Sequence, residues 1–235
     1  MMLEIRNLTV EVEGKKVLQG LDLEVGEKER HVLFGPNGSG KTSLVLTILG
    51  FPQYKVVSGS IRFDGVELLG KSIDERARLG LAVAFQKPPA VRGVRLGDIL
   101  QYLGGEGGLL SLLNLSEDFL ARELNVGFSG GEMRRTEVLQ VLAQKAKLAF
   151  FDEPDSGLDV ENLETVGRAI NEFLRERSGI IITHMGHILR HVQVDFAHVL
   201  LNGRIACSGS PSKILAQILK EGYKWCETCP RASRS

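Results

Sequence analysis

The segment Gly35-Pro-Asn-Gly-Ser-Gly-Lys-Thr42 constrains the fold more than any other feature of the chain. It matches the phosphate-binding pattern G-x-x-x-x-G-K-[ST] at every fixed position, and this pattern requires a strand before the loop and a helix after it. The apolar run His31–Phe34 precedes the loop, and the helical-looking run Ser43–Leu49 follows it. A chance glycine-rich turn is the alternative, and the matching flanks disfavour it.

The residue types in this loop explain how it would hold a nucleotide. Its glycines let the backbone curl until successive N–H groups point at phosphate oxygens, and the following helix adds the partial positive charge of its N-terminus. Lys41 is expected to reach the β- and γ-phosphates, and the Thr42 hydroxyl is expected to ligate the Mg²⁺ that bridges them. The expected nucleotide-binding residues of the loop are Gly35, Pro36, Asn37, Gly38, Ser39, Gly40, Lys41 and Thr42.

Two kinds of strand pattern surround the loop. Alternating apolar residues near the start predict antiparallel strands with one solvated face, and Ser60–Leu68 predicts a hairpin with Asp64-Gly65 at its turn. Uninterrupted apolar runs later in the chain predict parallel strands that are buried on both faces. The alternating residues are Leu3, Ile5, Val10 and Val12. The uninterrupted runs are Leu81–Phe85, Leu148–Phe151 and Ile180–Ile182.

Helix patterns complete the expected fold class. A chain of 235 residues with 43% hydrophobic content suits one α/β domain with an insertion. Residues 88–143 lack buried strand patterns and predict an inserted helical subdomain, which leaves residues 1–87 and 144–235 as the catalytic core. We expect a phosphate-loop α/β fold with a mixed central sheet and an antiparallel N-terminal region. The clearest helical stripe of the core is Leu163, Val166, Ile170, Phe173 and Leu174.

Charge and apolar content argue against several classes of function. Twenty-nine basic residues balance twenty-nine acidic ones, so no overall charge favours nucleic acid or an anionic membrane. The apolar stretch Leu109–Leu115 is too short to span a bilayer, and the first residues lack a signal-peptide pattern. The three cysteines do not form a disulfide framework. We therefore expect a soluble cytoplasmic protein with no nucleic-acid partner and no direct membrane insertion.

Two further spacings suggest metal ligands only weakly. Cys226 and Cys229 have the spacing of a redox or metal pair, but a tetrahedral zinc site needs four ligands and only two are local. His187 and His191 are four residues apart, which fits a polar helix face better than a metal site. Cys207 lies in a probable hairpin and is interpreted as a small core residue.

The segment Phe128–Glu132 predicts a second place where an anion could bind. Its serine and two glycines open a helix, where exposed N–H groups and the helix dipole favour negative charge. One nucleotide rarely needs two such cradles in a single chain. The alternative is a plain helix N-cap, which is a position that serine favours. The residues of this second cradle are Ser129, Gly130, Gly131 and Glu132.

The run Leu148–Glu153 is an apolar strand that ends in two acids. Because successive strand residues point to opposite sides, Asp152 and Glu153 cannot do the same job. Asp152 is expected to hold the Mg²⁺ shell, and Glu153 is expected to orient and deprotonate an attacking water. An acidic turn after a strand is the alternative, and it would be favoured if the phosphate loop were absent.

Polar residues at two other strand ends add to this group. Gln86 follows the strand Leu81–Phe85 and could reach the metal or its water through a neutral amide. His184 follows the run Ile180–Thr183 and could contact a γ-phosphate. A lone glutamine or histidine at a strand end is usually just a polar boundary residue. Asp159 could equally be the cap of a helix.

The order of these segments resembles the ATP-binding cassette family across essentially the whole chain. In that family the serine–glycine–glycine segment is the signature motif, and it contacts ATP held by the phosphate loop of a second subunit. The resemblance therefore explains the second cradle. It implies Mg²⁺-dependent ATP hydrolysis by an ATP-dependent head-to-tail homodimer, with two ATP molecules at the interface and Asp159 at the dimer seam.

The resemblance also assigns roles to individual residues. Residues of the phosphate loop would bind ATP from one copy, and Ser129–Glu132 would bind it from the other. The catalytic residues implied in this way are Lys41, Gln86, Glu153 and His184. The implied metal ligands are Thr42, Gln86 and Asp152.

Within the family, four segments are similar to the ATPases of Suf-type iron–sulfur cluster assembly, the SufC group. The signature ends in Glu132 where many transporter subunits have glutamine. This resemblance implies partner scaffolds like SufB or SufD, which would dock around Lys87–Arg92 and the helical subdomain. The alternative is the ATPase subunit of a membrane transporter. The four segments are Ala84–Pro89, Asn125–Glu132, Asp155–Asp159 and Glu221–Trp225.

The chain departs from the family in one respect. Cassette proteins commonly stack adenine on an aromatic residue of the first strands, but no Phe, Tyr or Trp precedes Phe34. Aliphatic residues such as Val12 or Val17 would support the base instead. We therefore expect modest affinity for ATP and poor discrimination against GTP.

Overall fold

Two β-sheets form the frame of the molecule in the computed structural model, which describes residues 1–105 and 108–227. The first sheet is antiparallel, with the strand order β2-β1-β4-β5. The second has six strands in the order β10-β9-β3-β8-β7-β6, and all neighbours in it are parallel except β9 and β10. The strands of the first sheet are β1 (Leu3–Val12), β2 (Lys15–Val25), β4 (Lys55–Phe63) and β5 (Val66–Glu67). Those of the second are β3 (Arg30–Phe34), β6 (Leu81–Ala84), β7 (Leu148–Asp152), β8 (Ser178–Thr183), β9 (Phe196–Leu201) and β10 (Arg204–Gly209).

The strand predictions are confirmed with small changes of length. The three uninterrupted apolar runs become β6, β7 and β8, which are adjacent and parallel. Asp64 and Gly65 have positive φ at the turn between β4 and β5, as expected for a tight hairpin. In β1 the register shifts after Ile5, where Asn7 takes a left-handed conformation, and Leu8 is thereby buried. Val12 is only partly buried, so the alternation weakens at the end of the strand.

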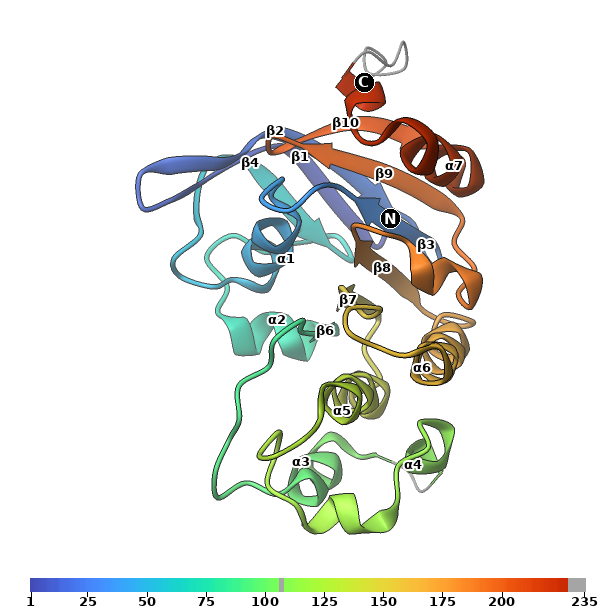
Figure 1. Ribbon diagram of the computed structural model, residues 1–235. Coiled ribbons are helices and arrows are strands. Elements are labelled where there is room, and N and C mark those ends of the chain that lie inside the picture. The colour runs from blue at the N-terminus through green and yellow to red at the C-terminus, as the bar shows by residue number, and fades with distance from the viewer. Residues whose placement is uncertain (106–107, 228–235) are drawn as a thin grey trace.

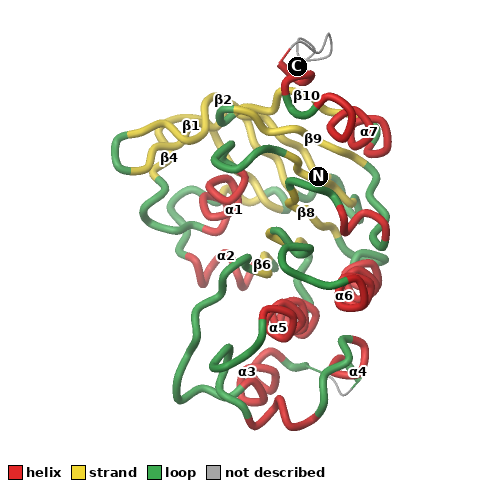
Figure 2. The backbone as a smooth tube through the Cα atoms, viewed as in Figure 1, coloured by secondary structure: helices red, strands yellow, loops and turns green. Residues whose placement is uncertain are grey.

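Helices lie on both sides of the strands (Figures 1 and 2). The chain from residue 88 to 143 contains α3 (Leu96–Leu103), α4 (Leu109–Leu112), the short 3₁₀ helix η1 (Glu117–Ala121) and most of α5 (Gly130–Gln144). These helices form the lower part of the view, away from the antiparallel sheet. The structure therefore has the α/β fold with a mixed sheet and an inserted helical region. The remaining helices are α1 (Lys41–Leu49), α2 (Ile73–Leu79), α6 (Val160–Phe173), η2 (His187–Arg190), α7 (Pro211–Glu221) and α8 (Lys224–Glu227).

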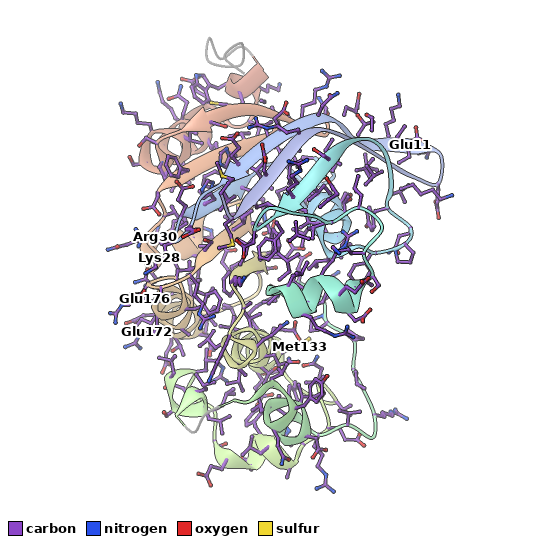
Figure 3. The ribbon with its side chains drawn as sticks, turned by 180° about the vertical axis from the view of Figure 1, so that it is seen from behind. Glu11, Lys28, Arg30, Met133, Glu172 and Glu176 are labelled. Atoms are coloured by element: carbon purple, nitrogen blue, oxygen red, sulfur yellow. The ribbon has the colours of Figure 1, made fainter. Side chains whose placement is uncertain are left out.

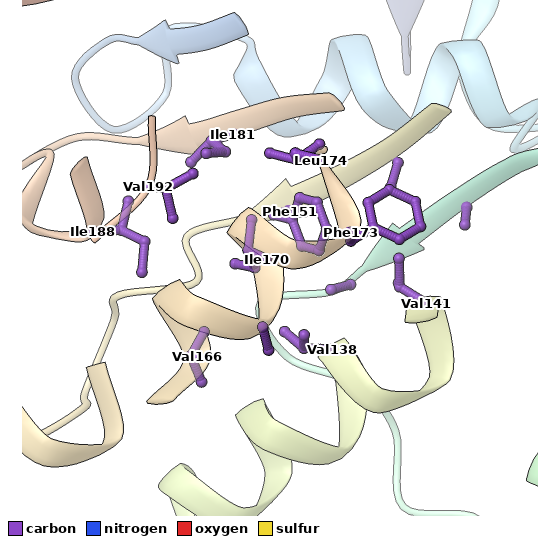
Figure 4. Close-up of a cluster of buried hydrophobic side chains, with 14 of the residues drawn as sticks. Val138, Val141, Phe151, Val166, Ile170, Phe173, Leu174, Ile181, Ile188 and Val192 are labelled. Atoms are coloured by element: carbon purple, nitrogen blue, oxygen red, sulfur yellow. The ribbon is translucent and has the colours of Figure 1, made fainter. Parts of the chain in front are cut away.

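The apolar core consists of two clusters. The smaller one fills the space between the antiparallel sheet, the inner strands and α1. The larger one joins the six-stranded sheet to the helical region. In Figure 4, Val138 of α5 lies near Val166 and Ile170 of α6, below Phe151 of β7. Full burial of one such side chain stabilises the fold by about 1.5–3 kcal/mol, so this seam fixes the helical region against the sheet.

Two ion pairs connect the start of β3 to neighbouring segments of the chain. Lys28 pairs with Glu176 at 2.5 Å, and the Arg30 guanidinium holds Asp195 with its nearest nitrogen at 2.7 Å. Figure 3 shows Lys28, Arg30 and Glu176 together on one side, apart from Met133 of α5. These contacts anchor the start of the strand that carries the phosphate loop at its other end. Within residues 1–105 and 108–227, no helix has the length and apolar character needed to cross a membrane.

Candidate functional site

The phosphate loop connects β3 to α1, as the sequence pattern predicts. Gly40 has a φ of 110°, and a Cβ placed on Gly35 would meet the Leu200 carbonyl oxygen at 2.5 Å. Only glycine fits both positions. Lys41 is 6% exposed, and its Nζ donates to the carbonyl oxygens of Gly35 at 2.8 Å and Pro36 at 3.1 Å. The loop thus closes on its own lysine and places that charge inside it.

A threonine and an aspartate meet directly beside this loop. The Thr42 hydroxyl donates to Asp152 Oδ2 at 3.0 Å, which joins the start of α1 to the end of β7. Asp152 is buried, and among the described residues its Oδ1 has no hydrogen-bond partner. Burial raises the pKa of Asp152, although the bond from Thr42 opposes the shift. An orphaned buried carboxylate oxygen next to a hydroxyl is the donor set that Mg²⁺ prefers.

The second acid of the pair points elsewhere and contacts a histidine. Glu153 is 4% exposed, and its Oε2 lies 2.6 Å from His184 Nδ1. Its other oxygen is 3.8 Å from Lys41 Nζ. Glu153 has a φ of 50°, and its N–H donates to the Ile182 carbonyl at 2.8 Å. The chain therefore turns sharply after β7, which separates the two carboxylates as strand alternation predicts.

Burial has the largest effect on the ionisation of Lys41 in the site. The pKa of Lys41 is lowered chiefly by desolvation, while Glu153 and Asp152 act in the opposite direction. The buried Lys41 ammonium thus attracts both buried carboxylates, while the two carboxylates repel each other, in a region of low dielectric. A bound phosphate or divalent cation would change the electrostatic environment of these three charged groups.

A cavity of about 590 Å³ opens beside the loop. It is lined by Gln86, Glu153 and Val17, together with loop residues Asn37, Gly38 and 40–43. Val12, the other aliphatic candidate for supporting a base, is not among its lining residues. The remaining lining residues come from β2 and the turn after β9: Lys15, Lys16, Gln19, Asn202 and Gly203. The sequence prediction did not include these five.

Gln86 is held in place by two charged residues of α5 that the sequence prediction also missed. Arg134 donates to the Phe85 carbonyl at 2.7 Å and to the Gln86 carbonyl at 2.9 Å. Glu137, one turn later, accepts from the Phe85 N–H at 3.0 Å. Burial lowers the pKa of Arg134 and raises that of Glu137. Charges three residues apart on the apolar side of a predicted helix were the available signal.

Asp155, to which the sequence prediction gave no role in the site, joins the loops that carry Glu153 and His184. Asp155 accepts a hydrogen bond from the Thr183 hydroxyl at 3.0 Å and from the Ile188 N–H at 3.3 Å. The Thr183 oxygen in turn accepts from the Gly186 N–H at 2.9 Å. The turns after β7 and β8 are thereby fixed to each other, which holds Glu153 opposite His184.

The second cradle lies at the N-terminus of α5. Ser129 is the N-cap: its hydroxyl accepts from the Glu132 N–H at 3.3 Å, and its own N–H donates to the Glu132 carboxylate at 2.7 Å. Ser129 and Gly130 are exposed, and none of the four cradle residues lines the cavity of the phosphate loop. The N-cap alternative is thus confirmed as local structure. Arg122 lies over the ring of Phe128, 4.3 Å from its centroid, and stiffens the approach to the cap.

Asp159 and the cysteines occupy structural positions. Asp159 is the N-cap of α6 and accepts from the Asn162 N–H at 2.8 Å. Cys207 is buried in the larger core cluster, as predicted, and Cys226 is fully buried there. Cys229 lies outside the described residues. Within the described part of the chain, no group of three or more His, Cys, Asp or Glu side chains is arranged to hold a metal ion.

The amino-acid sequence of this chain is similar to those of several known proteins. The family described as "ABC transporter" matches residues 18–156. "Vegetative protein 296" of Bacillus subtilis is 40% identical over 95% of this chain and 92% of its own length. The "probable ATP-dependent transporter SufC" of Escherichia coli is also 40% identical, over 95% of this chain and 98% of its own length. A "probable ABC transporter ATP-binding protein" of Streptococcus pyogenes serotype M3 is 38% identical over 94% and 93%.

Solved structures share the fold at lower identity. An ATP-binding subunit of an ABC transporter superposes with a TM-score of 0.81 at 23% identity, and the match covers 96% of this chain and 99% of that one. The ATP-binding cassette MJ0796, solved as a dimer after hydrolysis with ADP and phosphate bound, gives a TM-score of 0.76 at 20% identity. That match covers 89% of this chain and 98% of the other.

Proposed function

Because the chain belongs to the ATP-binding cassette family and hydrolyses ATP with Mg²⁺, we propose that it is the ATPase of a Suf-type iron–sulfur cluster assembly complex. Its hydrolysis cycle would move a soluble scaffold like SufB or SufD in the cytoplasm. The observation that carries the proposal is the 40% identity to SufC over nearly the full length of both chains. The segments that resemble the SufC group, among them Asn125–Glu132 and Glu221–Trp225, support it.

The proposed chemistry uses the residues that meet at the phosphate loop. Thr42 and Asp152 would hold Mg²⁺, which neutralises charge on the β- and γ-phosphates. Glu153 would accept a proton from the water that attacks the γ-phosphorus, while the bond to the β-phosphate breaks and ADP leaves. Lys41 would stabilise the charge of the transferred group.

His184 would complete the site through its free ring nitrogen. A carboxylate can only accept a hydrogen bond, so the contact to Glu153 at 2.6 Å places the histidine proton on Nδ1. The Nε2 atom is then available to the γ-phosphate side of the site. A movement of Gln86 in response to the phosphates would be transmitted to α5, because Arg134 of α5 donates a hydrogen bond to the Gln86 backbone carbonyl.

We propose further that two copies form an ATP-dependent head-to-tail homodimer. The exposed cap at Ser129 and Gly130 presents N–H groups and the positive end of α5 to solvent, and it does not line the cavity beside the phosphate loop of the same chain. A second copy that brings its phosphate loop to this cap would give both cradles a ligand. Asp159, at the start of α6, would lie at the seam.

The scaffold would dock near Lys87–Arg92, which follows Gln86. Pro88 and Pro89 stiffen this segment, so a movement of Gln86 would be passed on to a protein bound there. Asn125 donates to the Pro89 carbonyl at 3.1 Å and connects the segment to the approach of the second cradle. Nucleotide state and scaffold position would thus be linked through one short stretch.

The proposal is tested by the proteins that accompany this chain. We would purify it at native expression level from its source and identify co-purifying proteins by mass spectrometry, with the Lys41→Ala variant as a matched control for nucleotide-dependent contacts. Recovery of a SufB- or SufD-like scaffold is the expected result.

A membrane transporter is the second candidate function. It is favoured by the description of the matched family and by the names of the Streptococcus pyogenes relatives. Recovery of a polytopic membrane protein in the same purification would overturn the cluster-assembly proposal. The ATPase chemistry would stand, and the chain would be the motor of a transporter.

A further inference from the structure

The hydroxyl of Tyr223 lies where the C-terminal segment meets the nucleotide site. Tyr223 stands between α7 and α8, and its Oη donates to the backbone carbonyl oxygen of His184 at 2.7 Å. Its ring packs on the larger core cluster, as do Leu215 and Trp225. A residue near the end of the chain thus contacts the turn that carries the histidine facing Glu153.

The Tyr223 hydroxyl is neutral where it meets the His184 turn. Burial raises the pKa of Tyr223 to about 12, the charge of Glu153 adds to the shift, and a backbone hydrogen bond with Gly35 opposes it. Tyr223 is therefore a neutral phenol at working pH, and a phenol can donate one hydrogen bond while it accepts another. Its hydroxyl donates to the His184 turn, and its oxygen lone pairs remain available as acceptors.

The His184 turn is otherwise fixed at its two ends. Thr183 and Asp155 hold its beginning through the hydrogen bonds described above. A Cβ on Gly186 would meet Leu215 Cδ1 at 2.9 Å and Phe34 Cε1 at 3.1 Å, so the turn packs tightly there. Between these ends, the peptide group that joins His184 to Met185 is held from two sides. Its carbonyl oxygen accepts from Tyr223, and its N–H donates to the Thr183 hydroxyl oxygen at 3.2 Å.

We propose that Tyr223 is a positioning residue for ATP hydrolysis, which holds the turn that carries His184 through the bond from its hydroxyl to the His184 carbonyl. Loss of the hydroxyl would release the carbonyl side of this peptide group and would loosen the pair of His184 and Glu153. Nucleotide binding, which depends on the loop and Lys41, would change little. The inference rests on the proposed role of His184, and the experiment below separates the two.

The test compares the Tyr223→Phe variant with the parent protein in steady-state phosphate release. The variant keeps the packed ring and removes only the hydroxyl, so its melting temperature should stay within a few degrees of the parent's. We expect kcat to fall about tenfold, the effect of one lost hydrogen bond, with KM for ATP changed less than about twofold. Tyr54→Phe is the matched control, since Tyr54 is also partly buried but packs on the other core cluster.

A double-mutant cycle then asks whether Tyr223 acts through His184. If it does, Tyr223→Phe should cause no further loss in a His184→Ala background. An unchanged kcat in Tyr223→Phe, or a full additional tenfold loss on top of His184→Ala, would overturn the inference while the proposed site stands. Parental turnover in His184→Ala alone would overturn both the inference and the role of His184.

Discussion

The two anion cradles of this chain, the phosphate loop and the cap at Ser129, differ in how far each is buried and in how many of its partner groups come from the same chain. The phosphate loop surrounds a lysine that is 6% exposed, and Thr42 already contacts the buried Asp152. The cradle at Ser129 is exposed and satisfies its first N–H groups only through its own capping box with Glu132. One cradle is assembled before a nucleotide arrives, whereas the other has the charge of a helix end and does not line the cavity beside the phosphate loop.

This contrast suggests why a single chain carries both. Buried charges at the phosphate loop are arranged for an anion and a cation that enter one cavity. The exposed cap lacks such a cavity lining, and under the proposed dimer a second phosphate loop with bound ATP would supply the negative charge that it favours. Hydrolysis would then depend on assembly, although nucleotide binding would not.

The largest effect is expected from Glu153→Gln, which keeps the shape of the carboxylate but removes its proton-accepting capacity. Turnover should fall by about 100-fold or more, because the general base is lost. ATP binding should persist, and the ATP-bound dimer should become more stable since it no longer reaches products. Phosphate release and light scattering with Mg²⁺ and ATP measure the two effects. Unimpaired hydrolysis would remove Glu153 from the base role.

The two cradles themselves should fail in different ways. Lys41→Ala should weaken ATP binding to the single chain by about tenfold or more, because a charge-assisted contact to the phosphates is lost. Ser129→Arg should leave that binding constant unchanged and still lower turnover strongly, because it blocks the exposed cap. Titration of labelled ATP at low protein concentration distinguishes them.

Ser116→Arg is the matched control for the cap variant, since Ser116 is likewise a helix N-cap, in this case of the short 3₁₀ helix η1. Its turnover should equal that of the parent. Equal loss of single-chain binding in Lys41→Ala and Ser129→Arg would contradict the division of labour between the cradles.

A smaller effect is expected where α5 connects the two cradles. Arg134→Met removes the hydrogen bonds to the carbonyls of Phe85 and Gln86 and should lower kcat about tenfold with little change in ATP affinity. Arg135→Met is the control on the same helix, because Arg135 bonds the Leu113 and Asn114 carbonyls instead. A similar kcat loss in both variants would show that α5 acts only through general stability.

The smallest effect on turnover is expected at a histidine pair at the other end of β3, in which His31 is buried and His198 is half-buried. His31 Nδ1 lies 2.8 Å from His198 Nε2, Glu29 contacts His31 and Ser208 contacts His198. Their ring centroids are 5.1 Å apart and the rings are nearly coplanar, so the two nitrogens face each other head-on across a shared proton. Both rings have lowered pKa values because they are buried, and that of His198 falls to about 3.

The sign of the pH effect follows from proton binding. Between pH 3 and 6.5 the unfolded chain holds a proton on His198 that the folded chain does not, so stability falls as the pH drops through this window. At pH 5 this single group costs about 2 kcal/mol relative to neutral pH. Urea unfolding of His198→Gln should show a correspondingly weaker loss of stability between pH 7 and pH 5. The same loss in this variant as in His187→Gln, an exposed control, would contradict the assignment.

The parts of the molecule that the sequence predicted are those that depend on local pattern. The phosphate loop, the three buried parallel strands and the stripe of α6 follow from residue spacing alone, and each is where it was expected. The strand-end positions of Asp152, Glu153 and His184 followed from the same patterns. That these residues belong to one site was implied only by the family resemblance. In the structure they lie near one another because parallel strands present their carboxyl ends at one edge of a sheet.

The parts that were missed depend on contacts between distant segments. Arg134 and Tyr223 have no local motif, and their importance appears only when α5 and the C-terminal segment fold against the loops at the site. His31 looked like the first residue of an apolar strand, and its partner His198 is 167 positions away. Such pairs are set by tertiary packing, which spacing within one segment does not encode.

The claim that the two cradles act across two chains is tested most directly by mixing two inactive variants. Lys41→Ala supplies an intact cap and Ser129→Arg supplies an intact phosphate loop, so a mixed dimer has one complete composite site. Phosphate release from an equimolar mixture should recover to about a quarter of the parental rate, because half of the dimers are mixed and each has one working site of two. A mixture that stays as inactive as its separate components would contradict the head-to-tail account.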